Sequence, residues 1–133
     1  IFLSIGINDS QFIVSQNSRA ISIEKYLHNL QKIINQAKEH THKVFVLGLT
    51  DIDETRTIPV IYNEDKHYYK KNVQEYNAAT EELSERNNCI FIGLSGLISG
   101  DELFDGVHPT SSGHKKIFNK IKDFIVLNKI LEN

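Results

Sequence analysis

Three short apolar runs, each bounded by polar residues or glycine, predict buried β-strands. They cover residues 1–5, 44–49 and 89–92 and are rich in isoleucine, valine and phenylalanine. None of them alternates strictly between apolar and polar positions. That pattern is typical of strands that are covered on both faces, as in parallel sheets.

Helical periodicity follows each of these runs. Apolar residues at positions 23, 26, 27, 30, 33, 34 and 37 form one stripe of a helix, which Ser22 can cap at its N-terminus. A second helix is predicted over residues 69–86, and a third from residue 111 or 112 to residue 127. We expect the third helix to bury Ile117, Phe118, Ile121, Phe124 and Ile125.

The alternation of strands and helices predicts an α/β fold, with one parallel sheet, right-handed crossovers and helices packed on its faces. Ligands bind such folds beyond the carboxyl ends of the strands. The loops at those ends are residues 6–19, 50–67 and 93–109. The second is longer than most connections, and loops of that length are often functional. Its neighbourhood holds Tyr62, Tyr68 and Tyr69, which either line a pocket mouth or fill the core.

Composition narrows the classes of function. A chain of 133 residues forms one domain or part of one, and 40% apolar residues with 24% charged ones is an ordinary globular balance. The net charge of −2 argues against nucleic acid as a partner bound through bulk positive charge. No apolar run approaches the ~20 residues of a membrane-spanning helix. Cys89 is the only cysteine, which excludes an intrachain disulfide and a cysteine-based metal cluster.

The start of the chain suggests that residues are missing ahead of it. The sequence contains no methionine and opens with Ile-Phe-Leu-Ser-Ile, which resembles the middle of a buried strand. We therefore expect further residues before Ile1. No basic stretch precedes the apolar start as it would in a signal peptide, so a cytoplasmic location is favoured, although the segment that would carry a signal is expected upstream.

Two motifs at the predicted carboxyl edge of the sheet carry candidate chemistry. Gly-Ile-Asn-Asp (residues 6–9) follows the first strand, and Asp-Gly-Val-His-Pro (residues 105–109) precedes the last helix. An aspartate three residues before a histidine can accept a hydrogen bond from imidazole Nδ1–H, which leaves Nε2 free as a general base toward a serine hydroxyl. The alternatives are a turn aspartate beside a surface histidine, and ordinary turn capping by Asn8 and Asp9.

Together, these motifs resemble the SGNH, or GDSL-type, esterase and acylhydrolase (lipase-like) family, whose third and fifth blocks read Gly-x-Asn-Asp and Asp-x-x-His. The resemblance implies a three-layer α/β/α, flavodoxin-like fold and a serine esterase that cleaves carboxylic esters through an acyl-enzyme. It implies His108 as base and then acid, Asp105 as its orienter and Asn8 as an oxyanion donor. The implied partner is a small ester, such as an acetylated sugar, a lipid or a thioester, and no cofactor or metal is implied.

Two other blocks of that family have no counterpart in this sequence. No Gly-Asp-Ser occurs, and the nearest string, residues 99–102, lies in the wrong loop. Because residues 1–5 correspond to the family's third strand, we expect the nucleophilic serine upstream and residues 1–133 to be about the C-terminal two-thirds of a single domain. Ser10 is a weaker candidate nucleophile, since serine after Asn-Asp is a common cap.

Two other interpretations stay open. One is a non-catalytic product of the same fold, because the nucleophile is absent from the sequence as it stands. The other is a flavodoxin-like binding or regulatory module such as a receiver domain. That module needs acidic residues after its first strand and a lysine after its last, and neither is visible here.

Overall fold

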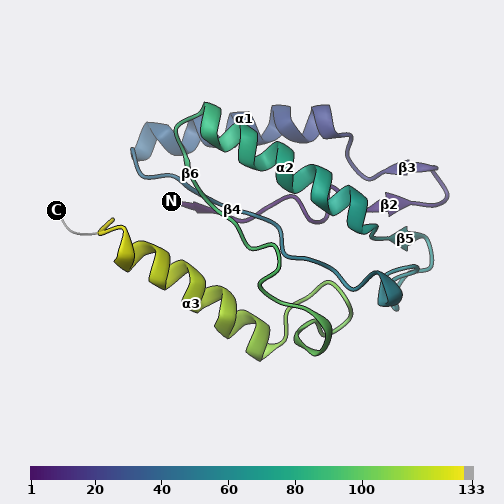
Figure 1. Cartoon of the computed structure of the whole chain (residues 1–133). Coiled ribbons are helices and arrows are strands. Elements are labelled where there is room, and N and C mark those ends of the chain that lie inside the picture. Colours follow the sequence, from purple (N-terminus) through teal and green to yellow (C-terminus); the bar gives the residue numbers. More distant parts are fainter. Residues whose placement is uncertain (131–133) are drawn as a thin grey trace.

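A three-stranded parallel sheet lies between two layers of helices in the computed structural model, which describes residues 1–130 (Figure 1). The strand order is β1-β4-β6. Helices α1 and α2 cover one face of this sheet, and α3 lies on the other. The predicted three-layer α/β/α architecture with a parallel sheet is confirmed. The bounds are β1 Phe2–Leu3, β4 Phe45–Leu47, β6 Ile90–Ile92, α1 Ile23–His40, α2 Lys70–Arg86 and α3 Ser111–Leu127.

The helix ends follow from local hydrogen bonds. The Ser22 side chain accepts from the backbone N–H of Lys25 at 3.4 Å, as predicted for the first helix. Thr110 caps α3 in the same way, with its hydroxyl accepting from Gly113 N–H at 3.4 Å. No side chain caps α2, which begins one residue later than its apolar pattern predicts. All three helices therefore lie where the periodicity places them.

A second, antiparallel sheet was not predicted. It consists of β2 (Phe12–Ile13), β3 (Ser18–Arg19) and β5 (Lys66–His67) in the order β3-β2-β5. Strands of two residues are too short to leave a periodic signal in the sequence. This small sheet joins the loop after β1 to the end of the loop after β4, which are the two loops that flank the candidate site.

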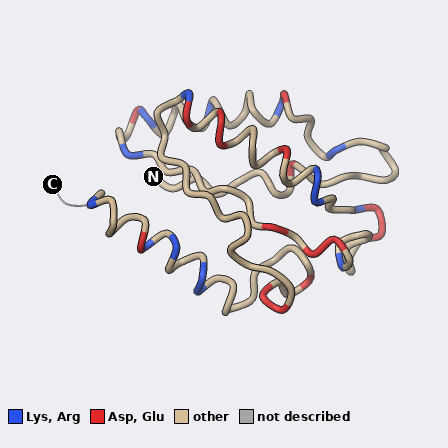
Figure 2. Tube along the Cα trace, viewed as in Figure 1, with Lys and Arg blue, Asp and Glu red and all other residues tan. Residues whose placement is uncertain are grey.

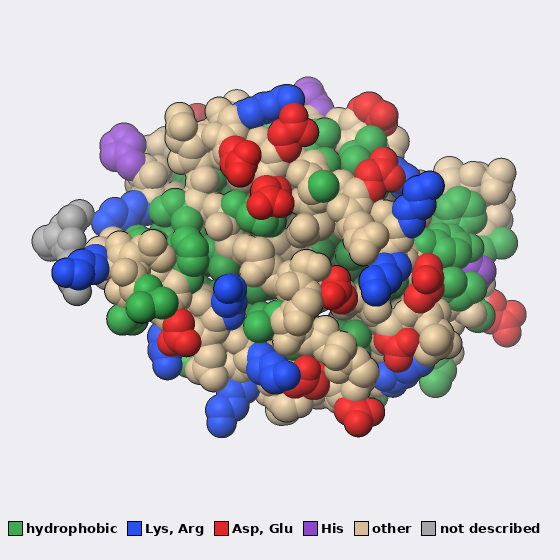
Figure 3. Space-filling model, viewed as in Figure 1, with side chains coloured by type: hydrophobic (Ala, Val, Ile, Leu, Met, Phe, Trp, Pro, Cys, Tyr) green, Lys and Arg blue, Asp and Glu red, His purple; other side chains and the backbone are tan. Residues whose placement is uncertain are grey.

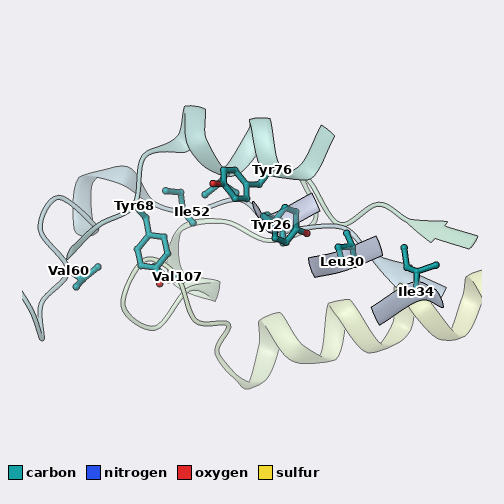
Figure 4. Packing of buried hydrophobic residues seen from close by; sticks show 10 residues of the cluster. Tyr26, Leu30, Ile34, Ile52, Val60, Tyr68, Tyr76 and Val107 are labelled. Atoms are coloured by element: carbon teal, nitrogen blue, oxygen red, sulfur yellow. The ribbon is translucent and has the colours of Figure 1, made fainter. Parts of the chain in front are cut away.

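The main core fills the space between the parallel sheet and the layer of α1 and α2 (Figure 4). Leu30, Ile34 and Tyr76 are completely buried there, and Tyr26 is 2% exposed. The hydroxyl of Tyr26 shares a hydrogen bond of 2.7 Å with the Thr80 hydroxyl, so the buried phenol keeps a polar partner. The same cluster continues beyond the strands to Ile52, Tyr68 and Val107, which lie in the loops that carry the candidate site.

The opposite face, under α3, is only partly covered. The prediction that Phe118 is buried is wrong, because its side chain is 63% exposed, and the other four predicted core residues of α3 are half-buried. Phe2 of β1 is also half exposed, although its ring stacks on Phe45 with centroids 4.5 Å apart. Phe118 and Phe2 are exposed for the same reason. Within residues 1–130, nothing pairs with the outer edge of β1 or covers the adjacent side of α3. An apolar groove of about 450 Å³ results.

We expect the chain expressed alone to self-associate through this edge. An exposed strand presents unpaired N–H and C=O groups that template pairing with other chains. Size-exclusion chromatography should show oligomers, and amide exchange should be faster in β1 than in β4. Phe118→Lys, which places a charge in the groove, should reduce association without changing protection of β4. A stable monomer with strongly protected β1 amides would contradict this expectation.

Charges of both signs are interspersed over the face seen in Figure 3. Figure 2 shows acidic residues on the loops after β4 and β6 and several lysines along α3. One of these lysines, Lys116, pairs with Glu102 at 2.7 Å, and the lysines of α3 are exposed as a solvated face. None of the helices in the described chain is both long and apolar enough to cross a membrane.

Candidate active site

The Asp105–His108 pair forms a closed hydrogen-bonded turn at the carboxyl edge of the sheet. The Asp105 Oδ2 atom lies 2.7 Å from His108 Nδ1. Its other oxygen, Oδ1, accepts from the backbone N–H groups of Val107 at 3.0 Å and His108 at 2.8 Å. The predicted spacing thus brings carboxylate and imidazole into direct contact, and this contact orients the ring with Nε2 facing away from Asp105.

The two side chains differ in exposure in the way a general base requires. The Asp105 side chain is 9% exposed, whereas that of His108 is 60% exposed. Burial raises the pKa of Asp105, but hydrogen bonds from the backbone and ring of His108 outweigh it, and the net pKa lies below the ordinary value. Asp105 is therefore ionised at neutral pH.

The turn is held by the long loop after β4. Gly106 has φ +94°, and a Cβ at this position would lie 2.8 Å from Thr57 Cγ2 and 3.0 Å from Arg56 Cβ. Asp53 N–H donates to the Gly106 carbonyl at 2.8 Å. The guanidinium of Arg56 donates to the carbonyl of Leu103 at 2.7 Å and also to that of Phe104. Only glycine fits at position 106, because both its conformation and its close neighbours exclude a side chain.

Asn8 lies in the loop that follows β1, and its side chain is exposed. Its Oδ1 accepts a hydrogen bond of 2.8 Å from the hydroxyl of Tyr68, a residue that is only 1% exposed. No described residue accepts a hydrogen bond from Asn8 Nδ2, so the amide N–H₂ remains available as a donor. Asp9 is half-buried, and its backbone carbonyl accepts from Ile21 N–H at 3.3 Å.

A cavity of about 270 Å³ joins the two motifs. Ile7, the neighbour of Asn8, and His108 both line it, together with Ser4 and His114. Asn8 itself does not line this cavity. The structure therefore brings the two motif loops to one hollow, although the catalytic roles of Asn8, Asp105 and His108 stay predictions.

The surroundings of Gly6 show why the Gly-Ile-Asn-Asp motif begins with a glycine. Its φ is +121°, and a Cβ would lie 2.7 Å from the buried hydroxyl of Tyr26. The chain can turn out of β1 toward Asn8 only because this side chain is absent.

We expect Gly6→Ala to lower the free energy of unfolding by about 1–3 kcal/mol through backbone strain and by about 1–3 kcal/mol more through the forced contact with Tyr26. Gly96→Ala is the matched control, because Gly96 also has a positive φ (+73°) but nothing within 4 Å of its Cβ position. Urea denaturation monitored by circular dichroism measures both variants. If both variants lost the same free energy of unfolding, the contact with Tyr26 would contribute nothing to the effect of Gly6→Ala.

Other candidate groups of the sequence lie outside the site. Ser10 is completely buried, and its hydroxyl donates to the Ile7 carbonyl at 2.7 Å, so it cannot reach a substrate. Residues 99–102 form a capping box around the short 3₁₀ helix η2 (Gly100–Glu102). No group of three or more His, Cys, Asp and Glu side chains within residues 1–130 is placed to bind a metal ion.

Sequence reasoning missed Arg56 and Thr57, and it named Tyr68 only as a residue of a pocket mouth or of the core, where Tyr68 is indeed buried. Arg56 and Thr57 brace the His108 turn, and Tyr68 contacts Asn8. The length of the loop after β4 was the only sequence signal for Arg56 and Thr57. Which residues of that loop face the site depends on its fold.

Comparison with solved structures shows the same fold in several bacterial hydrolases. A GDSL-like lipase from Bacteroides thetaiotaomicron VPI-5482 is 21% identical with a TM-score of 0.72, and the match covers 96% of this chain and 62% of that protein. A putative acylhydrolase from Bacteroides fragilis NCTC 9343 is 22% identical with a TM-score of 0.73, covering 98% and 62%. An acetylxylan esterase from Geobacillus stearothermophilus is 16% identical with a TM-score of 0.67, covering 90% and 56%.

The chain thus spans about three fifths of the length of the solved structures that it resembles. No curated protein matches it. The sequence profile of the GDSL-like Lipase/Acylhydrolase family, in contrast, matches residues 1–116. That match extends from β1 into α3 and includes both motif loops, and it shows that the chain belongs to the GDSL-like lipase/acylhydrolase family.

Proposed function

We propose that these residues form the base and oxyanion half of a serine esterase that hydrolyses small carboxylic esters through an acyl-enzyme. The observation that carries the proposal is the 2.7 Å contact between Asp105 Oδ2 and His108 Nδ1, made by an exposed ring at the edge of a cavity. Membership in a family of lipases and acylhydrolases supports the reaction class.

In the proposed reaction, His108 Nε2 takes the proton of a serine hydroxyl while the serine oxygen bonds to the ester carbonyl carbon. The carbonyl electrons move to the oxygen, and Asn8 Nδ2–H stabilises the resulting oxyanion. The C–O bond to the alcohol then breaks, and His108 returns the proton to the leaving oxygen. Water repeats the sequence on the acyl-enzyme, with Asp105 stabilising the imidazolium in both halves.

We place the nucleophilic serine on a segment outside residues 1–133. Three observations support this placement: no Gly-Asp-Ser occurs in the sequence, Ser10 is completely buried, and no strand within residues 1–130 pairs with the outer edge of β1. Ser4 is the one alternative to test within the chain, because it is exposed and lines the same cavity as His108.

A short acyl group is the substrate class that we propose. The cavity at His108 has a volume of about 270 Å³. That size is close to the lower end of the usual range for ligand pockets, about 300 Å³. An acetyl ester fits this size better than a long-chain lipid. The acetylxylan esterase among the similar folds makes an acetylated sugar the first natural substrate to try.

Labelling with a fluorophosphonate, which reacts with activated serines, tests where the nucleophile lies. We expect no labelling of the chain alone and strong labelling of the whole polypeptide that its gene encodes. Labelling of the chain alone that disappears in both His108→Ala and Ser4→Ala would instead assign the nucleophile to Ser4. Failure of the whole polypeptide to label or to hydrolyse esters would overturn the proposal and favour a non-catalytic binding module.

A further inference from the structure

Tyr68 connects the two halves of the proposed site. Its hydroxyl donates to Asn8 Oδ1 at 2.8 Å, and its ring belongs to the same buried cluster as Val107, which is next to His108 in the chain (Figure 4). We propose that Tyr68 is a positioning residue that fixes the amide of Asn8 with Nδ2 directed at the developing oxyanion. This inference rests on the proposed function.

An asparagine side chain needs such a partner, because its oxygen and nitrogen are nearly equal in shape but opposite in hydrogen bonding. Rotation of the amide by half a turn would present Oδ1, an acceptor, to the negatively charged oxyanion. A hydroxyl that donates to Oδ1 stabilises the productive orientation and penalises the reversed one. Asn8 is exposed and has no other described side-chain bond that could select its orientation.

The pKa of Tyr68 agrees with its role as a hydrogen-bond donor. Burial, together with the nearby Tyr62 and Asp105, raises the pKa of Tyr68 to about 12. The phenol therefore keeps its proton at neutral and moderately alkaline pH.

The backbone of Tyr68 is fixed independently of Asn8. Its N–H donates to the Thr57 carbonyl at 3.0 Å, and the completely buried Thr57 hydroxyl donates to the Tyr68 carbonyl at 2.9 Å. The methyl group of the same Thr57 is one of the atoms that a Cβ on Gly106 would meet, at 2.8 Å. Thr57 thus braces both the tyrosine that holds Asn8 and the turn that carries His108, which fixes the oxyanion donor relative to the base.

Tyr68→Phe removes the hydroxyl and keeps the ring in the core. We expect kcat for p-nitrophenyl acetate to fall about 10-fold with KM changed less than about twofold, a part of the ~10²–10³ that one oxyanion donor supplies. In an Asn8→Ala background the same substitution should have no further effect, since the group it positions is gone. Tyr69→Phe is the matched control, because the Tyr69 hydroxyl contacts His67 Nδ1 at 3.0 Å and not Asn8.

The experiment combines this double-mutant cycle with ¹⁵N–¹H spectra of the Asn8 side-chain amide, using the whole polypeptide as its gene encodes it. Support requires non-additive loss of kcat and shifted or broadened Asn8 amide signals in Tyr68→Phe but not in Tyr69→Phe. Unchanged kcat, or an equal loss with and without Asn8, would overturn the proposal. If no His108-dependent hydrolysis exists, the proposed function fails, and the spectra alone decide: unchanged Asn8 signals refute the positioning, and changed ones support it.

Discussion

His108→Ala is expected to lower kcat/KM for p-nitrophenyl acetate by about 10⁴–10⁶-fold in the whole encoded polypeptide, because the serine of the proposed mechanism then loses its general base. His108 is 60% exposed, so the substitution removes little buried surface, and the fold should remain. Steady-state kinetics measure the loss, and thermal denaturation checks the fold.

His40→Ala is the matched control for His108→Ala, since His40 is an exposed histidine at the end of α1, far along the chain from the site. It should leave kcat/KM unchanged. A His108→Ala protein that retains more than about a tenth of its activity would contradict the assignment of the base, because general base catalysis contributes at least about 10².

Asp105→Asn should reduce kcat by about 10⁴-fold, as expected when the partner no longer fixes the histidine tautomer. The substitution replaces a carboxylate that accepts three hydrogen bonds by an amide that can accept on only one of its two atoms. Asp101→Asn is the control, because Asp101 is exposed in η2 of the same loop. Equal kinetics for the two variants would show that Asp105 only caps the turn.

Asp105 also makes stability depend on pH, with a definite sign. Its pKa is lower in the folded chain than in the unfolded one, so the ionised form stabilises the fold. That stabilisation is present above the ordinary aspartate pKa and is lost as the pH falls through the lowered folded value. Urea midpoints between neutral and acidic pH should therefore fall less steeply for Asp105→Asn than for the unaltered chain.

The sequence predicted the main layers because each element carries its own signal. The stripe from Ile23 to Ala37 and the Ser22 cap specify α1 locally, and the β4 run is apolar because both its faces are covered. The burial of Phe118 could not be predicted correctly. Its apolar character indicates a covered face, but whether another element lies there is not a property of the helix sequence.

The candidate site also combines a contact that the sequence predicted with contacts that it did not. A spacing of three residues between Asp105 and His108 is a local pattern, and it correctly predicted their contact. The contact between Tyr68 and Asn8 was not predictable, because it joins residues that are sixty positions apart in the chain. Such a contact depends on the path of the loop after β4 and on the small antiparallel sheet, whose strands are too short to leave a pattern.

Mass spectrometry of the whole polypeptide, quenched during turnover of p-nitrophenyl acetate, tests the proposed esterase mechanism most directly. We expect one acetyl group on a serine outside residues 1–133, and none in His108→Ala. Turnover without any acetylated serine, or acetylation that persists at the same rate in His108→Ala, would contradict the assignment of His108 and Asp105 as the catalytic pair.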